Sequence, residues 1–233
     1  MSTYDIFTSP PIQIVRSSIL GETVLFSVDQ PKDLIQSHHL KGQFYEPDEL
    51  MIMSRVFPIG GRLLDIGANI GNHSVFFGKI MKASYIKPIE VNPRVISLLR
   101  SNLIINGLEE VCDTSHLGLG LYDEVKENVS IKFWENNIGG GKIKMADGEL
   151  NLVRGDDILT EPADLVKIDV EGAEIKVLNG MASYIDAHRP NMFIEVDNEN
   201  SDAFTAWVAD NKYRVLETFS RYDVNVNYLI TAQ

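Results

Sequence analysis

From about residue 60 onward, short apolar runs alternate with longer segments in which apolar residues recur every three or four positions. A short apolar run bounded by turn residues predicts a buried strand, and the longer period predicts a helix. Strands are expected at 62–66, 84–91, 111–117, 163–170, 191–196, 213–219 and 226–231. Helices are expected at 47–57, from the glycine turn after residue 66 to about residue 81, and at 93–106, 173–186 and 202–211.

This alternation predicts the fold class and the division of the chain. Strand–helix repeats with right-handed crossovers give an α/β fold with a doubly wound, mostly parallel sheet. The last two strands have no helix between them, so one of them should pair antiparallel. Residues 1–45, where prolines and Gly21 punctuate short β-like runs, are interpreted as an N-terminal extension, and residues 46–233 as one α/β domain. Within 84–91, Pro88 should cost the strand a ladder hydrogen bond unless the backbone bulges there.

A β-hairpin insertion is expected after the third strand, at 129–145. Its tight loop at 136–141 contains three consecutive glycines, more than a turn requires, so we interpret the loop as a candidate lid or acceptor-contact segment. Phe133, Trp134 and Tyr45 are candidates for the apolar wall or stacking face of a ligand site, with ordinary packing as the alternative.

The charge balance changes which partners are expected. Lysine and arginine number 21, and aspartate and glutamate 33, which gives a net charge of −12. Such an acidic surface repels phosphate backbones and anionic lipids, so we expect no nucleic-acid partner. The 44% of hydrophobic and 23% of charged residues exclude a disordered or collagen-like chain.

The sequence shows no mark of a membrane-spanning or secreted protein. No uninterrupted apolar run approaches the roughly 18 residues of a membrane span, and the first residues lack the charged and apolar regions of a signal peptide. The single cysteine, Cys112, can form neither an internal disulfide nor a multi-cysteine zinc site, and is expected to be a packed strand thiol. We therefore expect a cytoplasmic protein with no integral membrane association.

The turn after the strand at 62–66 is the strongest indication of a ligand site. Gly67 and Gly71 would let the backbone approach a ligand, and the following helix offers free N–H groups to an anionic group. Glu90 ends the next strand, 23 positions beyond Gly67, where a carboxylate could accept hydrogen bonds from both hydroxyls of a ribose. The spacing G-x-x-x-G lacks the third glycine that a pyrophosphate site requires. S-adenosylmethionine has no phosphate, and Asp65 could face its ammonium group unless it caps the next helix instead.

Three strings of residues carry a resemblance to a known family: LDIGANIGNHS at 64–74, EVNP at 90–93 and KIDVEGAE at 167–174. The chain resembles the FkbM family of S-adenosylmethionine-dependent methyltransferases from about Gly42 to Glu195. That resemblance implies the Rossmann-like fold of class I methyltransferases and, as is common in the family, methylation of a hydroxyl on a sugar, a glycan or a small metabolite. It also makes residues 46–233 the S-adenosylmethionine-binding domain. One departure is Ile89, which precedes Glu90 where the family has an aromatic residue.

The resemblance places the cofactor against the glycine turn and the acid of the next strand, and we include the neighbouring positions of the same loops. The predicted cofactor-binding set is Asp65, Gly67, Ala68, Asn69, Gly71, Asn72, Glu90, Val91, Asn92 and Asp169. S-adenosyl-L-methionine is the predicted cofactor, and a small-molecule or glycan acceptor is the predicted partner.

Methyl transfer is a displacement that depends on positioning, and an alcohol acceptor must also lose its proton to a base. By the resemblance, Asp169 and Glu171 line the active site. On an extended chain two such residues point to the same side, and their paired charge would raise the pKa of one of them. The alternatives are that Asp169 caps the helix beginning near residue 172 or contacts the ammonium group of the cofactor. His73, at the start of the helix after the glycine turn, is the third catalytic candidate, with an ordinary helix position as its alternative.

The other histidines and the remaining acids are given weaker roles. His116 is expected to pack beside the adenine, and His38, His39 and His188 to be solvated. Four acids at expected strand ends have the oxygens that Mg²⁺ prefers: Asp169, Glu171, Glu195 and Asp197. Acids collect at strand ends in this fold without a metal, so no metal ligand is predicted.

Other functions fit the residues less well. A nicotinamide-dependent oxidoreductase would need the third glycine and a Tyr-Lys or His pair at the hydride site, which we do not find. A non-catalytic cofactor-binding module would be expected to lose Asp169 and Glu171, and both are present. A nucleic-acid methyltransferase is disfavoured by the net charge and by the lack of an Asn-Pro-Pro-aromatic string. The sequence is compatible with a homo-oligomer but identifies neither the oligomeric state nor the acceptor.

Overall fold

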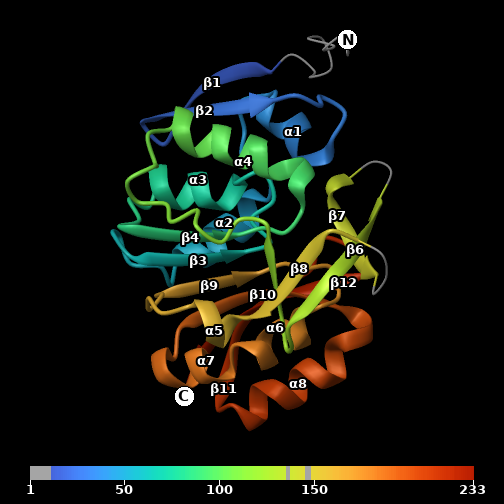
Figure 1. Ribbon diagram of the computed structural model, residues 1–233. Helices are drawn as coiled ribbons and strands as arrows, with labels where there is room; N and C mark the ends of the chain where they lie inside the picture. Colours follow the sequence, from blue (N-terminus) through green and yellow to red (C-terminus); the bar gives the residue numbers. More distant parts are fainter. Residues whose placement is uncertain (1–11, 135–136, 145–147) are drawn as a thin grey trace, which may run out of the picture.

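The computed structural model describes the backbone of residues 12–134, 137–144 and 148–233, and the side chains of these residues outside 131–147 (Figure 1). Its central sheet has six strands in the order β11-β12-β10-β9-β3-β4. They span Arg62–Ile66 (β3), Tyr85–Ile89 (β4), Leu165–Ile168 (β9), Asn191–Asp197 (β10), Tyr213–Phe219 (β11) and Asn225–Ala232 (β12). β4, β3, β9 and β10 run parallel, and β12 is antiparallel to both β10 and β11. The predicted doubly wound, mostly parallel sheet is confirmed, and so is the antiparallel closing strand.

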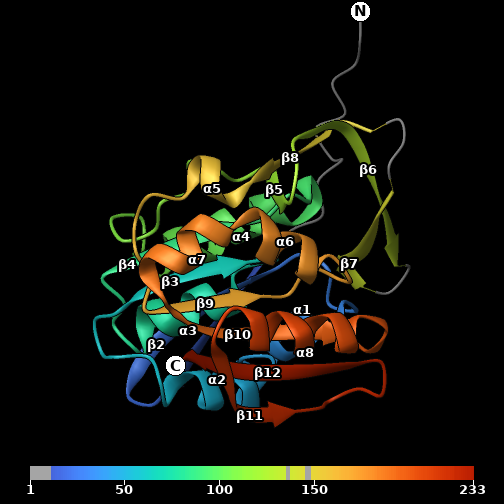
Figure 2. The ribbon, with the colours of Figure 1, turned by 90° about the horizontal axis from the view of Figure 1, so that it is seen from below.

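Helices cover both faces of this sheet (Figures 1 and 2). On one side lie α1 (Leu34–His39), α2 (Pro47–Ser54), α3 (Asn72–Lys79) and α4 (Pro93–Ile105). On the other side lie α5 (Gly155–Ile158), α6 (Glu174–Gly180), α7 (Ala182–His188) and α8 (Ser201–Asp210), with the short 3₁₀ helix η1 (Asn198–Asn200) before α8. Successive strand residues point to opposite faces, so Leu63 belongs to the core beneath α3 and Leu64 to the core beneath α6, α7 and α8.

A second sheet, of four strands in the order β5-β8-β6-β7, carries the predicted hairpin. Its strands span Leu119–Tyr122 (β5), Lys126–Trp134 (β6), Asn137–Lys144 (β7) and Leu150–Arg154 (β8). The β6–β7 hairpin lies beside the carboxyl ends of the parallel strands (Figures 1 and 2). The loop predicted at 136–141 is wrong from residue 137 on, because the glycine run belongs to β7, whose pairing shifts register between Phe133 and Trp134. Residues 135–136 and the side chains of these two aromatics lie outside the described residues.

Residues 111–117 do not form the predicted third strand. Cys112 makes an isolated bridge to Ile86 of β4. The chain then turns, because the Asp113 carboxylate accepts a hydrogen bond from the N–H of Ser115 at 3.0 Å. The next strand, β5, pairs with β8 instead of β4. Cys112 is nevertheless buried, as predicted.

Pro88 lies in β4 without a bulge, since the pairing with β3 passes through it with no shift in register. Ile86 directs its backbone groups away from β3: its N–H donates to the Val111 carbonyl at 2.8 Å, and its carbonyl accepts from the Asp113 N–H at 2.9 Å. Residues two apart in a parallel strand direct their backbone groups to the same side, so the missing N–H of Pro88 falls on this outer edge. The bulge offered as the alternative does not occur, and the pairing with β3 continues through Pro88.

The helix predicted over 173–186 is divided into α6 and α7. α6 ends at Gly180, where the backbone lies so close to the carbonyl oxygen of Tyr122 that a Cβ would overlap it. At the start of α7, the N–H of Tyr184 donates to the Asp156 carboxylate at 2.9 Å. The single helix was a wrong prediction because both contacts come from segments distant in the sequence.

The N-terminal extension contributes two strands: β1 (Gln13–Ile19) and β2 (Glu22–Val28), which pair antiparallel. Two asparagines, one within α4 and one at its C-cap, occupy the outer edge of β2. The N–H of Ser27 donates to Asn102 at 2.7 Å, and that of Leu25 donates to Asn106 at 3.0 Å. The extension thus packs against α4, and the domain boundary at residue 45 stays a prediction.

Candidate active site

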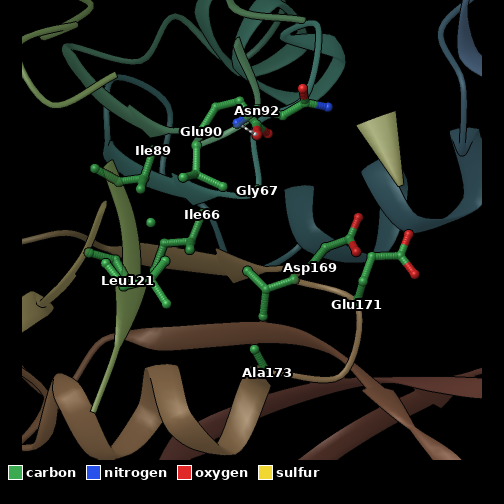
Figure 3. A pocket seen from close by; sticks show the side chains of 13 residues that line it. Ile66, Gly67, Ile89, Glu90, Asn92, Leu121, Asp169, Glu171 and Ala173 are labelled. Carbon is green, nitrogen blue, oxygen red and sulfur yellow. Dashed lines mark hydrogen bonds between the residues drawn. The ribbon is translucent and has the colours of Figure 1, made fainter. Parts of the chain in front are cut away.

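A cleft opens at the carboxyl ends of β3, β4 and β9 and encloses about 590 Å³, including the part open to solvent (Figure 3). Its apolar walls are formed by Ile66, Ile89, Val91, Leu121, Leu152 and Val170. Its polar residues are Glu90, Asn92, Asp169 and Glu171. A mainly apolar pocket with a few polar groups, at this edge of a doubly wound sheet, is the usual form of a small-ligand site.

Half of the residues predicted for the site line this cleft: Gly67, Glu90, Val91, Asn92, Asp169 and Glu171. The other predicted residues lie outside its lining, in β3, the glycine turn and α3: Asp65, Ala68, Asn69, Gly71, Asn72 and His73. The contacts of this second group show what each does in the fold, and the binding roles predicted for both groups stay predictions.

Gly67 brings the turn after β3 against the chain that follows β9. Its φ is +74°, and a Cβ at this position would overlap the carbonyl oxygen of Asp169. The N–H groups of Gly67 and Ala68 donate to the Ile89 carbonyl at 2.9 and 3.1 Å. That of Gly71 donates to Ala68 at 2.8 Å. These three N–H groups therefore close the turn onto β4 and onto itself. The N–H groups expected to be free for an anionic group are those of the first turn of α3, and that expectation stays a prediction.

Glu90 is held in place by the backbone on both of its oxygens. Oε2 accepts from the N–H of Asn69 at 2.8 Å. Oε1 accepts from the N–H of Asn92 at 2.7 Å (Figure 3). Burial raises the pKa of Glu90, and the two N–H donors partly offset that rise. Each carboxylate oxygen has two lone pairs, so each retains an acceptor position after its backbone bond. Two adjacent acceptors at a cleft wall match a pair of neighbouring hydroxyls.

Asp65 is fully buried behind the cleft. Its Oδ2 accepts from the Ser74 hydroxyl at 2.7 Å, which ties β3 to α3. Its Oδ1 has no hydrogen-bond partner in the described structure and lies 3.5 Å from the ammonium nitrogen of Lys167. The charge that Asp65 faces is therefore a lysine of the protein. The alternative that it caps α3 is wrong, because the N-cap of α3 is Gly71.

Lys167 is the central cation of the site, and the sequence analysis did not single it out. Its Nζ donates to the Gly67 carbonyl at 2.7 Å and lies 3.6 Å from Oδ2 of Asp169. Burial alone would lower the pKa of Lys167, but the carboxylates of Asp169 and Asp65 outweigh it and raise the pKa to about 12. The sequence does contain a signal for this residue, namely a lysine within an otherwise apolar strand. Because a buried lysine requires charged partners, that pattern predicts nearby acids.

The prediction that Asp169 and Glu171 lie on an extended chain is wrong. The strand β9 ends at Ile168, and Glu171 has a φ of +52°. Their carboxylates nonetheless point to the same side of the cleft (Figure 3). The alternative that Asp169 caps the next helix is wrong: α6 has Ala173 at its N-cap and no side-chain cap bond. Both residues line the cleft, and the roles predicted for them stay predictions.

The carboxyl groups of Glu46 and Glu195 interact with the charge of Asp169, and both have raised pKa values. Burial, followed by the charge of Asp169, raises the pKa of Glu46 to about 8 and that of Glu195 to about 9. Glu46 occupies the N-cap of α2, and its side chain makes no cap bond there. The sequence analysis did not consider Glu46 and considered Glu195 only for a metal, because nothing local marks either residue as buried among acids.

His73 lies in the first turn of α3 with its side chain 8% exposed, and its Nε2 is 3.6 Å from a carboxylate oxygen of Glu46. Burial, followed by the charge of Lys167, lowers the pKa of His73 to about 3, so the imidazole is neutral at physiological pH. A pKa this low makes His73 a weak proton acceptor at neutral pH. The catalytic role of His73 stays a prediction.

Asn72 uses its side chain to hold the segment before α2. Its Oδ1 accepts from the N–H of Tyr45 at 2.9 Å, and its Nδ2 donates to the Tyr45 carbonyl at 3.0 Å. His39 also contacts Asn72, at 3.1 Å, and stacks on Phe26 with ring centroids 4.3 Å apart. The prediction that His39 is solvated is therefore wrong, because its ring is buried between the extension and α3.

The location of His116 differs from the one expected. His116 lines a second cavity, with Tyr85, Lys87 and Asp113, and lies outside the lining of the main cleft where the adenine was expected. Among the residues that the structure describes, no group of three or more histidine, cysteine, aspartate or glutamate side chains is arranged to hold a metal ion. No helix in this part of the chain is long and apolar enough to cross a membrane.

Residues 65–215, from the glycine turn through β10 to β11, match the sequence model of the methyltransferase FkbM domain. The chain belongs to the FkbM methyltransferase family. Among proteins of curated function, none matches the chain by sequence. The family places the chain among methyltransferases, and it confirms the resemblance carried by the three sequence strings.

Solved structures share the fold of this FkbM family member. The tRNA m1G37 methyltransferase of M. jannaschii gives a TM-score of 0.55 at 13% identity, over 94% of this chain and 57% of that chain. A methyltransferase FkbM from Methylobacillus flagellatus KT gives 0.51 at 17% identity, over 83% and 52%. A protein of the NADB-Rossmann superfamily from Streptococcus agalactiae gives 0.54 at 16%, over 81% and 69%. These likenesses show a Rossmann-like fold, and the chain spans little more than half the length of the two methyltransferases.

The comparisons bear on the expected partners as well. The structures similar to this chain include tRNA methyltransferases, so the expectation that this chain binds no nucleic acid is not supported by them. The arguments against a nucleic-acid substrate come from the sequence: the net charge of −12 and the lack of an Asn-Pro-Pro-aromatic string.

Proposed function

We propose that this FkbM family member binds S-adenosylmethionine in the main cleft and transfers its methyl group to a hydroxyl of a sugar, a glycan or another small metabolite. Glu90 carries this proposal: its two oxygens are oriented by backbone N–H groups, and each keeps an acceptor position for one hydroxyl of a ribose. The apolar side chains of Ile89, Leu121 and Leu152 would cover the adenine.

The charges of the cleft favour this cofactor over a dinucleotide. Glu90, Asp169 and Glu171 line it, so a pyrophosphate would lie among carboxylates. The nearby cation, Lys167, is already engaged by the Gly67 carbonyl and by Asp65. A ligand with a ribose at one end and positive charge at the other fits the same residues, which argues against a nicotinamide-dependent oxidoreductase.

When bound, S-adenosylmethionine supplies a methyl group on a positively charged sulfur, and the protein supplies position and a proton acceptor. Glu90 would hold the ribose, and Asp169 would face the charged end. Glu171 and His73 would stand on the acceptor side. In the reaction the acceptor oxygen forms a bond to the methyl carbon, the carbon–sulfur bond breaks with its electron pair on sulfur, and the hydroxyl proton passes to a carboxylate of the site.

Isothermal titration calorimetry tests the cofactor assignment. S-adenosylmethionine and S-adenosylhomocysteine should bind the wild type, and NADH should not. Glu90→Gln should weaken both by about tenfold to a hundredfold, since a hydrogen bond to a charged group contributes about 1.5–3 kcal/mol. Glu110→Gln, at an exposed position, is the matched control. Unchanged affinity in Glu90→Gln would show that Glu90 does not bind the ribose. A wild type that binds neither S-adenosylmethionine nor S-adenosylhomocysteine would overturn the proposed function.

Incorporation of labelled methyl groups tests the acceptor class. Nucleotide sugars, lipid-linked glycans and small hydroxylated metabolites should be offered with labelled S-adenosylmethionine, and tRNA should be offered in parallel. Label in a hydroxylated compound supports the proposal. Label in tRNA alone would show that the acceptor is tRNA instead of a small hydroxylated compound, and it would leave the cofactor assignment intact.

A further inference from the structure

The chain that follows β9 forms a tight turn over residues 169–173, and this turn carries two of the carboxylates in the main cleft. Every residue of the turn except Gly172 lines the cleft (Figure 3). The N–H of Ala173 donates to the Val170 carbonyl at 3.3 Å. The two residues between them, Glu171 and Gly172, have φ values of +52° and +92°. Turns with positive φ at both central positions favour glycine, asparagine and aspartate there, so a glutamate keeps this conformation only when its surroundings impose it.

The first residue of the 169–173 turn is fixed by its contacts with β3 and β9. The N–H of Asp169 donates to the Ile66 carbonyl at 3.1 Å. The carbonyl oxygen of Asp169 lies so close to Gly67 that a Cβ there would overlap it. The ammonium of Lys167 lies 3.6 Å from the Asp169 carboxylate. These contacts hold Asp169, and the far end of the turn needs a support of its own.

Asn200 and Glu174 hold the far end of the turn. The side-chain Nδ2 of Asn200 donates to the Gly172 carbonyl at 3.2 Å and to Oε1 of Glu174 at 3.0 Å. The same oxygen of Glu174 accepts from the N–H of Asp197, the last residue of β10, at 2.8 Å. Glu174 is completely buried, and its Oε2 has no hydrogen-bond partner in the described structure. One carboxylate oxygen and one amide group therefore tie the turn to the carboxyl end of β10.

Both of these residues make their contacts at a cost in local stability. Asn200 is the N-cap of α8, where an asparagine side chain usually accepts from an N–H of the first turn. Its side chain makes no such cap bond and reaches across to the start of α6 instead. Glu174 buries a carboxyl group with one oxygen unpartnered, which is unfavourable for a polar group. Residues that break such local rules are expected at functional sites.

We propose that Asn200 and Glu174 are positioning residues for the methyl transfer. By holding the carbonyl of Gly172, they keep Glu171 in its left-handed conformation with its carboxylate in the cleft. This inference rests on the proposed function, which places Glu171 on the acceptor side and Asp169 at the charged end of the cofactor. Neither positioning residue belongs to the described lining of the cleft, so both act through the turn. Because Asp169 has its own contacts, loss of the Asn200 contact should disturb the acceptor side and spare cofactor binding.

Two asparagines of η1 offer a matched pair of variants. Asn200→Ala removes the contact with the turn, and its half-buried position should allow the variant to fold. Asn198→Ala removes a similar bond, from Nδ2 to the Asp223 carbonyl at 2.7 Å, which joins η1 to the segment before β12. In calorimetry, both variants should bind S-adenosylmethionine and S-adenosylhomocysteine as the wild type does. The kcat for the acceptor found by the incorporation assay should fall about tenfold to a hundredfold in Asn200→Ala alone, because a displacement of about 1 Å can cost that much.

Crystal structures with S-adenosylhomocysteine test the turn itself and need no acceptor. In Asn200→Ala, Glu171 should leave its φ of +52° or its carboxylate should move by about 1 Å, whereas Asn198→Ala should keep the wild-type turn. Glu174→Met fills a similar volume without an acceptor and should lose both the turn conformation and kcat. Glu174→Gln should restore most of both, because its amide oxygen can accept the two bonds of Oε1 and its nitrogen replaces an oxygen without a partner.

The outcomes separate this inference from the proposed function. An unchanged turn in Asn200→Ala, or an equal fall of kcat in Asn198→Ala, would overturn the inference while the proposed function stood. Loss of S-adenosylhomocysteine affinity in Asn200→Ala as large as the loss of kcat would also overturn it, because the contact would then serve cofactor binding and not the acceptor side. A wild type that binds neither S-adenosylmethionine nor S-adenosylhomocysteine would overturn the proposed function itself, and crystal structures of the free proteins would still decide whether Asn200 holds the turn.

Discussion

Replacing Lys167 by methionine should severely destabilise the protein, because this lysine is the cation that its buried acids face. Lys167 is 4% exposed and Asp65 is completely buried. The ammonium also donates to the carbonyl oxygens of Gly67 at 2.7 Å and Ile66 at 3.4 Å. A methionine of similar length fills the volume but supplies no charge and no donor, so the change isolates the electrostatic role from packing.

The expected loss is about 3–5 kcal/mol in the free energy of unfolding, the cost of removing one partner of a buried ion pair. That is a large share of the roughly 5–15 kcal/mol by which small domains are stable. Most of the loss should come from Asp65, whose charge would remain buried. Asp169 should contribute less, because its side chain is 34% exposed and water can solvate it.

Urea unfolding at pH 7 measures this loss, and a double variant tests its cause. Asp65→Asn combined with Lys167→Met should be more stable than the sum of the single losses predicts, because it removes the unpaired charge. Lys176→Met is the matched control: its ammonium pairs with Asp123 at 2.8 Å, but its side chain is 48% exposed, so about 0–1 kcal/mol should be lost. A loss below about 1 kcal/mol for Lys167→Met, or strictly additive losses in the double variant, would refute the reasoning.

Two further predictions test the glycine turn after β3 and the raised pKa values of Glu46 and Glu195. Gly67→Ala should destabilise far more than the matched Gly107→Ala: both positions have positive φ, but a Cβ overlaps the Asp169 carbonyl only at Gly67 and meets nothing within 4 Å at Gly107. Thermal unfolding of both variants checks this, and equal losses would contradict it. The pKa values of Glu46 and Glu195, raised to about 8 and about 9, make the folded state bind more protons than the unfolded chain near neutral pH. The free energy of unfolding should therefore fall from pH 7 to pH 8.5, and Glu195→Gln should flatten the fall; an identical slope in the variant would count against these raised pKa values.

Elements governed by neighbouring residues were well predicted. The helix expected at 93–106 is α4, Pro93–Ile105, with proline in its first turn and Gly107 at a φ of +68° after its end. The Asn92 side chain accepts from the N–H of Arg94 at 3.0 Å and caps the start. All these signals act within a few residues, so the sequence pattern contains them.

The wrong predictions have three different causes. The third strand failed because Asp113 turns the chain, and the helix at 173–186 was split where Gly180 meets Tyr122. The glycine run read as a loop forms β7, because strand pairing uses the backbone and needs no side chain. The division of the helix comes from a contact distant in the sequence, whereas the other two come from a two-residue turn and from the pairing of adjacent strands.

Some residues of the candidate site were predictable from the sequence, and others only from the folded structure. The sequence by itself determined the glycine turn, the acid that ends β4 and the segment after β9, and with them the family, because these strings place particular residue types at the carboxyl ends of consecutive strands. Only the tertiary structure decided that Lys167, Glu46 and Glu195 join them. The physical reason is that the protonation of a carboxyl group depends on its loss of water and on charges nearby, and folding assembles both from segments more than a hundred residues apart.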